Sequence, residues 1–263
     1  MNIISLIKQV PDTAQLSKTV DGLKLMEEGS PRIVNPWDEY ALETALQLKE
    51  AHGGQVTVLC LGKPEAAEAL KTGLAMGADE AVLISDPAMA NSDTLATARI
   101  LVAAVKKIGE FDLILGGRSA IDGNNAATAV QVAAMLDLPQ ISYVAELNVE
   151  PDTRSVRAVR LLESGRERVS SRYPAVITVV KEINEPRYPS FIGIRKAAKA
   201  TIPTWGLTEL GWAADQVGEA GSQTSWPEVT VPPAREAQAE IIEGSPEEAA
   251  KILADRLVAE KVI

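Results

Sequence analysis

Short apolar runs rich in β-branched residues alternate with helix-like segments along the first 180 residues of the chain. The runs lie at 2–7, 55–61, 81–84 and 111–117, with another at 174–180. Amphipathic or apolar segments at 35–52, 64–76 and 92–109 separate the first four runs, and a further one at 124–138 follows the fourth. Buried parallel strands need helices on both faces of their sheet. The alternation therefore predicts an α/β, doubly wound fold with a mostly parallel sheet.

The pattern changes after residue 140, where three strand-like segments follow one another without helices between them. Residues 155–163 and 166–173 are joined by Glu-Ser-Gly, which predicts a β-hairpin excursion. Beyond residue 200 the chain is rich in proline and lacks the periodic apolar residues of a core, and it ends in a helix capped by Ser245. We therefore expect a main α/β domain over 1–199 and a C-terminal arm and helix over 200–263. Exposed Trp205, Trp212 and Trp226 would suit an interface with a partner.

The segment 35–52 carries well-marked helix start signals. Asn35 is a favourable N-cap residue, Pro36 has no amide hydrogen to leave unpaired, and Asp38 lies three residues beyond the cap. Trp37 continues the apolar stripe of this helix. A locally capped helix with a buried stripe is the expectation.

Composition excludes several kinds of chemistry. The formal net charge is −10, whereas nucleic-acid binding requires a basic face. Cys60 and His52 are the single cysteine and histidine, so no intrachain disulfide forms, and neither a Ser-His-Asp triad nor a zinc site has suitable ligands. We predict no catalytic or metal-ligating side chains, and any chemistry would belong to a bound cofactor. The sequence shows neither a secretory signal nor an apolar run of about 20 residues, so a cytoplasmic location and no membrane span are expected.

The segment 116–128, Gly-Gly-Arg-Ser-Ala-Ile-Asp-Gly-Asn-Asn-Ala-Ala-Thr, joins an apolar strand to a predicted helix. Ligands of open α/β sheets bind beyond the carboxyl ends of the strands, where small residues and free helix amides accommodate phosphate. Gly123 is expected to allow a positive φ. The segment matches neither the Walker loop nor Gly-x-Gly-x-x-Gly, and a plain strand-to-helix turn would use the same residues. The local sequence therefore allows both a ligand-binding loop and a plain turn.

Several motifs along the chain carry a family resemblance. They are Ser-Leu-Ile-Lys-Gln-Val-Pro-Asp-Thr at 5–13, Asn-Pro-Trp-Asp-Glu-Tyr at 35–40, Asp-Leu-Ile-Leu-Gly-Gly-Arg-Ser-Ala-Ile-Asp-Gly at 112–123 and Asn-Glu-Pro-Arg-Tyr-Pro-Ser-Phe at 184–191. In this order they resemble the electron transfer flavoprotein beta subunit, strongly over residues 1–200 and more loosely beyond.

This resemblance implies a subunit that pairs with an alpha subunit carrying FAD near the boundary between them. Such dimers carry electrons from flavin dehydrogenases, for example acyl-CoA dehydrogenases, to a second oxidoreductase that delivers them to quinone, NAD or ferredoxin. It also implies an adenine nucleotide alpha-hydrolase-like fold with a buried AMP. Carried over by position, the cofactor-binding residues are Leu6, Asn35, Pro36, Trp37, Asp38, Leu61, Gly117, Asp122, Gly123, Asn124, Asn125, Ala126, Ala127 and Thr128.

The resemblance assigns different roles within that set. Backbone atoms of Leu6 and Leu61 would contact adenine, and the amides of 124–128 would hold phosphate. Trp37 would approach the alpha-subunit flavin, unless it is a core residue of its helix.

The identity of the nucleotide stays open at this point. AMP-binding members have Asn-Gln-Thr-Gly where this chain has Ala-Ala-Thr-Ala at 126–129, which keeps Thr128 alone. Electron-bifurcating members, with a second FAD in that place, share Asp122, Gly123 and Ala126 but also have a glutamine and Gly-Pro that are absent here. The retained hydroxyl favours AMP over FAD.

Residues 184–199 resemble the family's recognition loop, which docks on partner dehydrogenases. Phe191 has the place of the apolar anchor, with Arg195 and Lys196 as a basic fringe. The competing interpretation is a phenylalanine packed beneath its own loop.

Two other functions compete with electron transfer. An ATP-consuming enzyme of the same fold group needs Ser-Gly-Gly-x-Asp-Ser after the first strand, where this chain has Lys-Gln-Val-Pro-Asp-Thr. A stand-alone adenine-nucleotide-binding protein would have no use for the arm.

Overall fold

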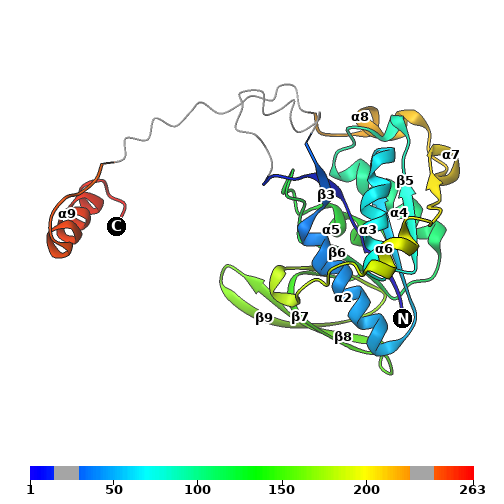
Figure 1. Cartoon of the computed structure of the whole chain (residues 1–263), viewed down its shortest axis with the longest axis horizontal. Helices are drawn as coiled ribbons and strands as arrows, with labels where there is room; N and C mark the ends of the chain where they lie inside the picture. Colours follow the sequence, from blue (N-terminus) through cyan, green and yellow to red (C-terminus); the bar gives the residue numbers. More distant parts are fainter. Residues whose placement is uncertain (15–29, 226–239) are drawn as a thin grey trace. The chain divides into compact units, whose positions relative to one another are not determined.

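A nine-stranded, mostly parallel sheet forms the centre of the computed structural model, which describes residues 1–14, 30–225 and 240–263 (Figure 1). The strand order is β11-β5-β4-β1-β6-β10-β7-β8-β9, and β2 and β3 form a separate antiparallel pair. The strands are β1 (Asn2–Leu6), β2 (Gln9–Pro11), β3 (Arg32–Val34), β4 (Gln55–Leu61), β5 (Glu80–Ile84), β6 (Leu113–Gly117), β7 (Gln140–Glu150), β8 (Ser155–Leu162), β9 (Gly165–Arg172), β10 (Ala175–Val179) and β11 (Thr204–Trp205).

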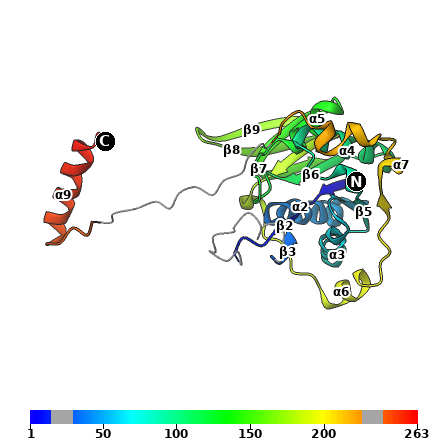
Figure 2. The same ribbon diagram turned by 90° about the horizontal axis from the view of Figure 1, so that it is seen from above.

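Helices cover both faces of this sheet, as predicted. Figure 2 shows α2 (Pro36–His52), α3 (Ala67–Met76) and α6 (Phe191–Ala197) on one side and α4 (Thr94–Ile108), α5 (Thr128–Met135) and α7 (Leu207–Leu210) on the other. Each face has its own buried apolar cluster, as expected when strands pack helices on both sides. The remaining described helices are α8 (Gly218–Gly221), α9 (Pro246–Ala259) and the 3-10 turns at Pro64–Ala66, Pro87–Met89, Lys181–Ile183 and Ala214–Gln216.

The chain reverses its direction of sheet building next to β1. From β1 it adds β4 and β5 on one side, and then returns to place β6 on the other side of β1. The carboxyl ends of β1 and β6 therefore diverge at a topological switch point, the usual place for a ligand in an open α/β sheet.

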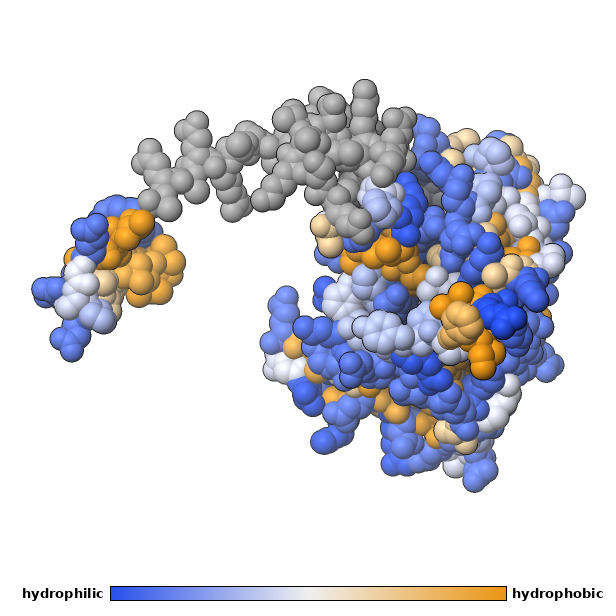
Figure 3. Space-filling model, in the orientation of Figure 1, coloured by the Kyte–Doolittle hydropathy of each residue, from blue (hydrophilic) through white to orange (hydrophobic). Residues whose placement is uncertain are grey.

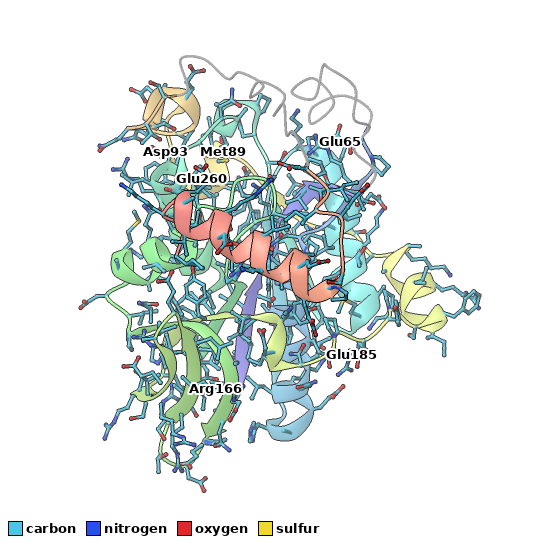
Figure 4. The ribbon with its side chains drawn as sticks, turned by 90° about the vertical axis from the view of Figure 1, so that its left-hand side faces the viewer. Glu65, Met89, Asp93, Arg166, Glu185 and Glu260 are labelled. Atoms are coloured by element: carbon cyan, nitrogen blue, oxygen red, sulfur yellow. The ribbon has the colours of Figure 1, made fainter. Side chains whose placement is uncertain are left out.

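The predicted excursion is present. β7, β8 and β9 pair antiparallel, the hairpin turn falls at Glu163 and Ser164, and β10 returns between β6 and β7. Arg166, labelled in Figure 4, lies on this hairpin, which is rich in exposed charge. Such charge discourages pairing at the sheet edge.

Helix starts agree with the sequence at three places and differ at a fourth. Pro36 begins α2, Asp93 caps α4 through a bond from the Ala96 amide, and Ser245 caps α9. The helix expected from residue 124 begins only at Thr128, because the preceding residues take left-handed conformations that no helix continues.

The first part of the predicted arm packs on the sheet. β11 pairs with β5, Trp205 and Trp212 pack partly buried against one core cluster, and Asp93 (Figure 4) accepts hydrogen bonds from the Gln223 and Thr224 amides. The compact unit accordingly runs from Met1 to Pro227, beyond the expected boundary at 199, and the second unit is Glu228–Ile263. Trp226 lies outside the described residues.

Candidate functional site

Asp38, in the first turn of α2, connects the ends of the two strands that flank the switch point. Its carboxylate accepts hydrogen bonds from the backbone amides of Lys8, just past β1 (2.8 Å), and of Gly117, at the end of β6 (3.0 Å). Asp38 is buried, and burial raises the pKa of its carboxyl from 3.8 to about 7, although hydrogen bonds to Asn35, Lys8 and Gly117 act in the opposite sense.

Asn35 makes a second link and corrects the capping prediction. Its side chain does not cap α2; its Nδ2 donates to the carbonyl of Ser119 (2.8 Å) and its Oδ1 accepts from the amide of Ile121 (3.1 Å). The Asn35 amide donates to the Lys8 carbonyl (2.8 Å). Asn35 and Asp38 thus bind two loops rather than the helix end, so the predicted capping box was wrong.

Gly117 lies where α2 comes closest to the sheet. A Cβ built there would be 2.6 Å from the Asp38 Oδ1, and equally close to the carbonyl carbon and Cβ of Trp37. Only glycine fits such an approach without movement of the backbone. At neighbouring Gly116, a Cβ would make ordinary contacts with Leu6 and Ala129, at 3.8 and 3.9 Å.

The loop from Arg118 to Ala127 turns through left-handed backbone at Asn124 (φ 48°) and Ala126 (φ 53°). Gly123 does not have the positive φ we expected, because the neighbouring asparagine, which tolerates that region, takes it instead. Ala127 precedes α5 without a side-chain cap. The first amides of α5 therefore have neither an intrahelical nor a side-chain cap partner, which suits an anionic group.

Of the six buried side-chain atoms without a hydrogen-bond partner among the described residues, three lie in the same region. The described residues supply no hydrogen-bond partner for the Arg118 Nε, the Ser119 Oγ or the Gln131 Oε1, the last of these in α5. Because unsatisfied buried polar groups are rare in native proteins, each calls for an external partner. These atoms and the uncapped start of α5 fit a polar, phosphate-bearing ligand.

Lys8 is a charged residue of this site that sequence reasoning did not single out. Its Nζ pairs with the Asp122 carboxylate at 2.6 Å and so joins the loops after β1 and β6 across the switch point. A basic residue directly after the first strand was the available signal.

Three predicted residues lie around this centre. Trp37 is partly buried, and the Arg118 guanidinium stands 4.3 Å from its ring centroid, so it belongs to the edge of the site and not to the core stripe. Leu6 and Leu61 end the neighbouring strands β1 and β4, both partly buried. We call the region formed by Leu6–Lys8, Asn35–Asp38 and residues 116–128 the switch-point site.

A second feature lies along α2 and the end of α3, where residues 184–197 cross the surface. Phe191 is 76% exposed, which rules out the interpretation that it packs beneath its own loop. It begins α6 with exposed Ile192 and Ile194, and Arg195 and Lys196 follow. Figure 3 shows apolar surface bordered by charged residues at the place of α6.

Other kinds of site find no support within the described ranges. No group of three His, Cys, Asp or Glu side chains gathers as for a metal, and none of the helices seen in those ranges combines the length and apolar character that crossing a membrane requires. Cys60 is buried, and burial raises the pKa of its thiol to about 12, so the thiolate is suppressed.

The sheet, its switch point and the glycine-containing loop define the chain as a doubly wound α/β protein with a candidate ligand site at the carboxyl ends of its strands. The family model "Electron transfer flavoprotein domain" matches residues 22–210. Two relatives match over 100% of both chains: the electron transfer flavoprotein subunit beta of Thermoanaerobacterium thermosaccharolyticum, 41% identical, and that of Clostridium acetobutylicum, 39% identical. The caffeyl-CoA reductase-Etf complex subunit CarD of Acetobacterium woodii is 39% identical over 89% of each chain. The chain belongs to the electron transfer flavoprotein beta-subunit family, and this membership supports a role in electron transfer.

Proposed function

We propose that this chain is the beta subunit of a heterodimeric electron transfer flavoprotein that carries electrons from a flavin dehydrogenase to a second oxidoreductase. The observation that carries the proposal is the switch-point site, where α2 draws the ends of β1 and β6 together beside an uncapped helix. FAD, shared with an alpha subunit, supplies the electron-carrying chemistry. The residues of this chain would bind the adenine nucleotide and help to orient the FAD.

The nucleotide proposed for the switch-point site is AMP, held at phosphate by the amides of 124–128 and at adenine by the backbone of Leu6 and Leu61. Lys8, which is paired with Asp122, and Arg118, over the Trp37 ring, supply positive charge within the switch-point site. The relative CarD is named as a subunit of a caffeyl-CoA reductase complex, which favours an enzyme acting on CoA thioesters, such as an acyl-CoA dehydrogenase, as electron donor. A quinone, NAD or ferredoxin oxidoreductase would accept the electrons, in the cytoplasm.

The alternative within the family is a second FAD in place of AMP, as in electron-bifurcating members. The remaining alternative, a stand-alone adenine-nucleotide-binding protein, would not need the second unit. That unit carries an amphipathic helix, α9, whose Ile252, Leu253 and Val258 are exposed. Such a surface suits an alpha subunit as partner.

The nucleotide released from the purified heterodimer tests this proposal. Denaturation followed by chromatography should release one FAD and one AMP per heterodimer. Two FAD per heterodimer would replace the AMP proposal by the bifurcating one. An adenine nucleotide bound to this chain alone, with no complex formed with the alpha subunit in gel filtration, would favour the stand-alone protein.

Phe191 is proposed as the main docking contact for the dehydrogenase. Phe191→Ala should weaken dehydrogenase binding by about 1–3 kcal/mol, the usual cost of removing a central interface side chain. Nucleotide content and melting temperature should stay at wild-type values because the side chain is 76% exposed. Binding is measured by titration of the heterodimer with the dehydrogenase.

Leu162→Ala is the matched control for this substitution. Leu162 is another exposed apolar side chain, on β8, and its removal should leave dehydrogenase binding unchanged. Unchanged binding of the Phe191 variant would remove the docking role.

A further inference from the structure

Residues 184–197, which we call the docking segment, have an outer and an inner side. The outer side consists of Tyr188, Phe191, Ile192 and Ile194, which are 94, 76, 79 and 51% exposed. Large apolar side chains at such exposure gain nothing from the fold of this chain, and together they are typical of a contact surface. The inner side is tied to the helices below at several points.

Arg187 makes the strongest of these ties, to Glu43 and Glu50, which lie two turns apart on the same face of α2. Its Nε donates to the Glu43 Oε2 (2.8 Å) and its Nη2 to the Glu43 Oε1 (2.9 Å), so the pair is bidentate. Its Nη1 and Nη2 also donate to the two oxygens of Glu50, at 2.5 and 3.0 Å. The side chain of Glu43 is only 4% exposed. A buried carboxylate needs such a partner, so the arginine is held in one geometry.

Further contacts fix the segment on both sides of Arg187. The Asn184 Nδ2 donates to the Tyr40 carbonyl (3.0 Å) and the Thr44 Oγ1 (2.8 Å), again on α2. Glu185, labelled in Figure 4, follows directly in the stretch that leads to α6. These bonds leave little freedom to the chain before Tyr188.

At its other end the segment is seated on α3. A Cβ on Gly193 would lie 2.2 Å from the Ala75 carbonyl oxygen, so α6 touches the end of α3 through bare backbone. Ser190 caps α6 by accepting from the Gly193 amide (3.0 Å), and Ala197 is buried. The exposed residues thus lie between two fixed points.

We propose that Arg187, through Glu43 and Glu50, and Gly193, through Ala75, are positioning residues that hold the docking segment in its binding conformation before the partner arrives. This proposal rests on the docking role proposed above. An ordered segment loses less conformational freedom on binding than a flexible loop, which raises affinity without any new contact. Because Asn35 directly precedes α2 and Asp38 lies in its first turn, one helix holds both the docking segment and the switch-point site.

The outer side of the docking segment indicates the chemistry of the partner surface that it contacts. The four exposed apolar side chains of residues 188–194, followed by Arg195, Lys196 and Lys199, match an apolar groove with an acidic rim on the partner protein. The basic residues would act on the association rate and its salt dependence.

The test compares variants of the heterodimer by two measurements, hydrogen exchange of the amides of 188–196 and affinity for the dehydrogenase. Arg187→Gln should speed exchange in this segment and weaken binding about tenfold, with nucleotide content unchanged. Arg187→Lys keeps the charge but not the planar fork and should fall in between. Gly193→Ala, which forces α6 from its seat, should reproduce both effects without any change of charge.

Two further variants make the result decisive. Arg187→Gln leaves Glu43 as an unpaired buried charge, so the Glu43→Gln/Arg187→Gln pair removes the link without that penalty and is scored if the single variant fails to fold. Arg166→Gln, which breaks an exposed ion pair with Glu146 on the hairpin, should change neither measurement.

The outcomes separate this proposal from the docking role itself. Wild-type exchange and affinity in the double variant and in Gly193→Ala, beside weakened binding by Phe191→Ala, would overturn the positioning role alone. Unchanged binding by Phe191→Ala would overturn the docking role, whatever the exchange rates show.

Discussion

Gly117→Ala should lower the free energy of unfolding by about 1–3 kcal/mol and empty the switch-point site of nucleotide. The added methyl would lie 2.6 Å from the Asp38 Oδ1 and from two atoms of Trp37, one of them in the backbone. Backbone does not yield as a flexible side chain does, so α2 and β6 must separate. Separation breaks the bond from the Gly117 amide to Asp38 and shifts the loop that follows.

Gly116→Ala is the matched control, one residue earlier on the same strand. Its methyl would meet only ordinary contacts at 3.8 and 3.9 Å, so stability and nucleotide content should stay close to wild type. Urea denaturation gives the first quantity and chromatography of the released nucleotide the second. Equal behaviour of the two variants would show that the close approach of α2 to β6 does not shape the site.

The sheet was predictable because its signal is local and repeated. Each buried parallel strand must be apolar along its whole length, and the runs at 2–7, 55–61 and 111–117 show this without any knowledge of their neighbours. The carboxyl ends of β1, just before Lys8, and of β6, at Gly117, then meet at the switch point because β1 and β6 are neighbours in the sheet. The first residue of α2 was predictable as well, because proline is favoured at the first position of a helix.

The side-chain contacts of the site were not predictable in the same way. Asparagine and aspartate beside a helix start suit a local cap and a distant loop equally, and nothing near Asn35 reveals a partner more than 80 residues away. The same holds for Arg187, whose glutamate partner Glu43 lies 144 residues earlier. Residue type indicated that a bond would form, but only the fold decides with which group.

The tryptophans of the predicted arm illustrate a further limit. The irregular sequence beyond residue 200 indicated a segment without a core of its own, which is correct for residues 200–225, and we inferred exposed apolar surface from it. The segment instead uses the core of the sheet, through Trp205 on β11 and through Val217, which is buried. A segment without apolar periodicity does not reveal from its sequence which hydrophobic core it packs against.

Asp38 should make the stability of this protein fall as the pH rises from about 4 to about 7. Its carboxyl has a pKa of about 7 in the folded chain against 3.8 ordinarily, chiefly because burial disfavours the charged form. Below pH 4 the Asp38 carboxyl is protonated in both the folded and unfolded states, so its titration does not lower the stability. Between the two pKa values the folded state keeps a proton that the unfolded state has lost, so stability drops by up to about 1.4 kcal/mol per pH unit.

The comparison with Asp38→Asn isolates this term, because the amide is neutral throughout and the remaining groups titrate alike in both proteins. The stability of wild type minus that of Asp38→Asn should decrease steadily with pH in this window and level off above pH 7, when unfolding is followed in urea at constant ionic strength. The Asp38 charge also contributes to the raised pKa of the Cys60 thiol, but with a pKa of about 12 that group titrates above this pH window in both proteins.

Glu50→Gln is the control, because the stability difference between wild type and this variant should change with pH in the opposite direction. The Arg187 guanidinium lowers the pKa of Glu50, so this group stabilises the fold above its ordinary pKa of 4.5 and the contribution is lost as the pH falls. Wild type minus Glu50→Gln should therefore rise with pH where wild type minus Asp38→Asn falls. A flat or rising difference for Asp38 would mean that the amides of Lys8 and Gly117 stabilise the carboxylate more than burial disfavours it. Asp38 would then hold β1 and β6 together as a charged group at every pH at which the protein is folded.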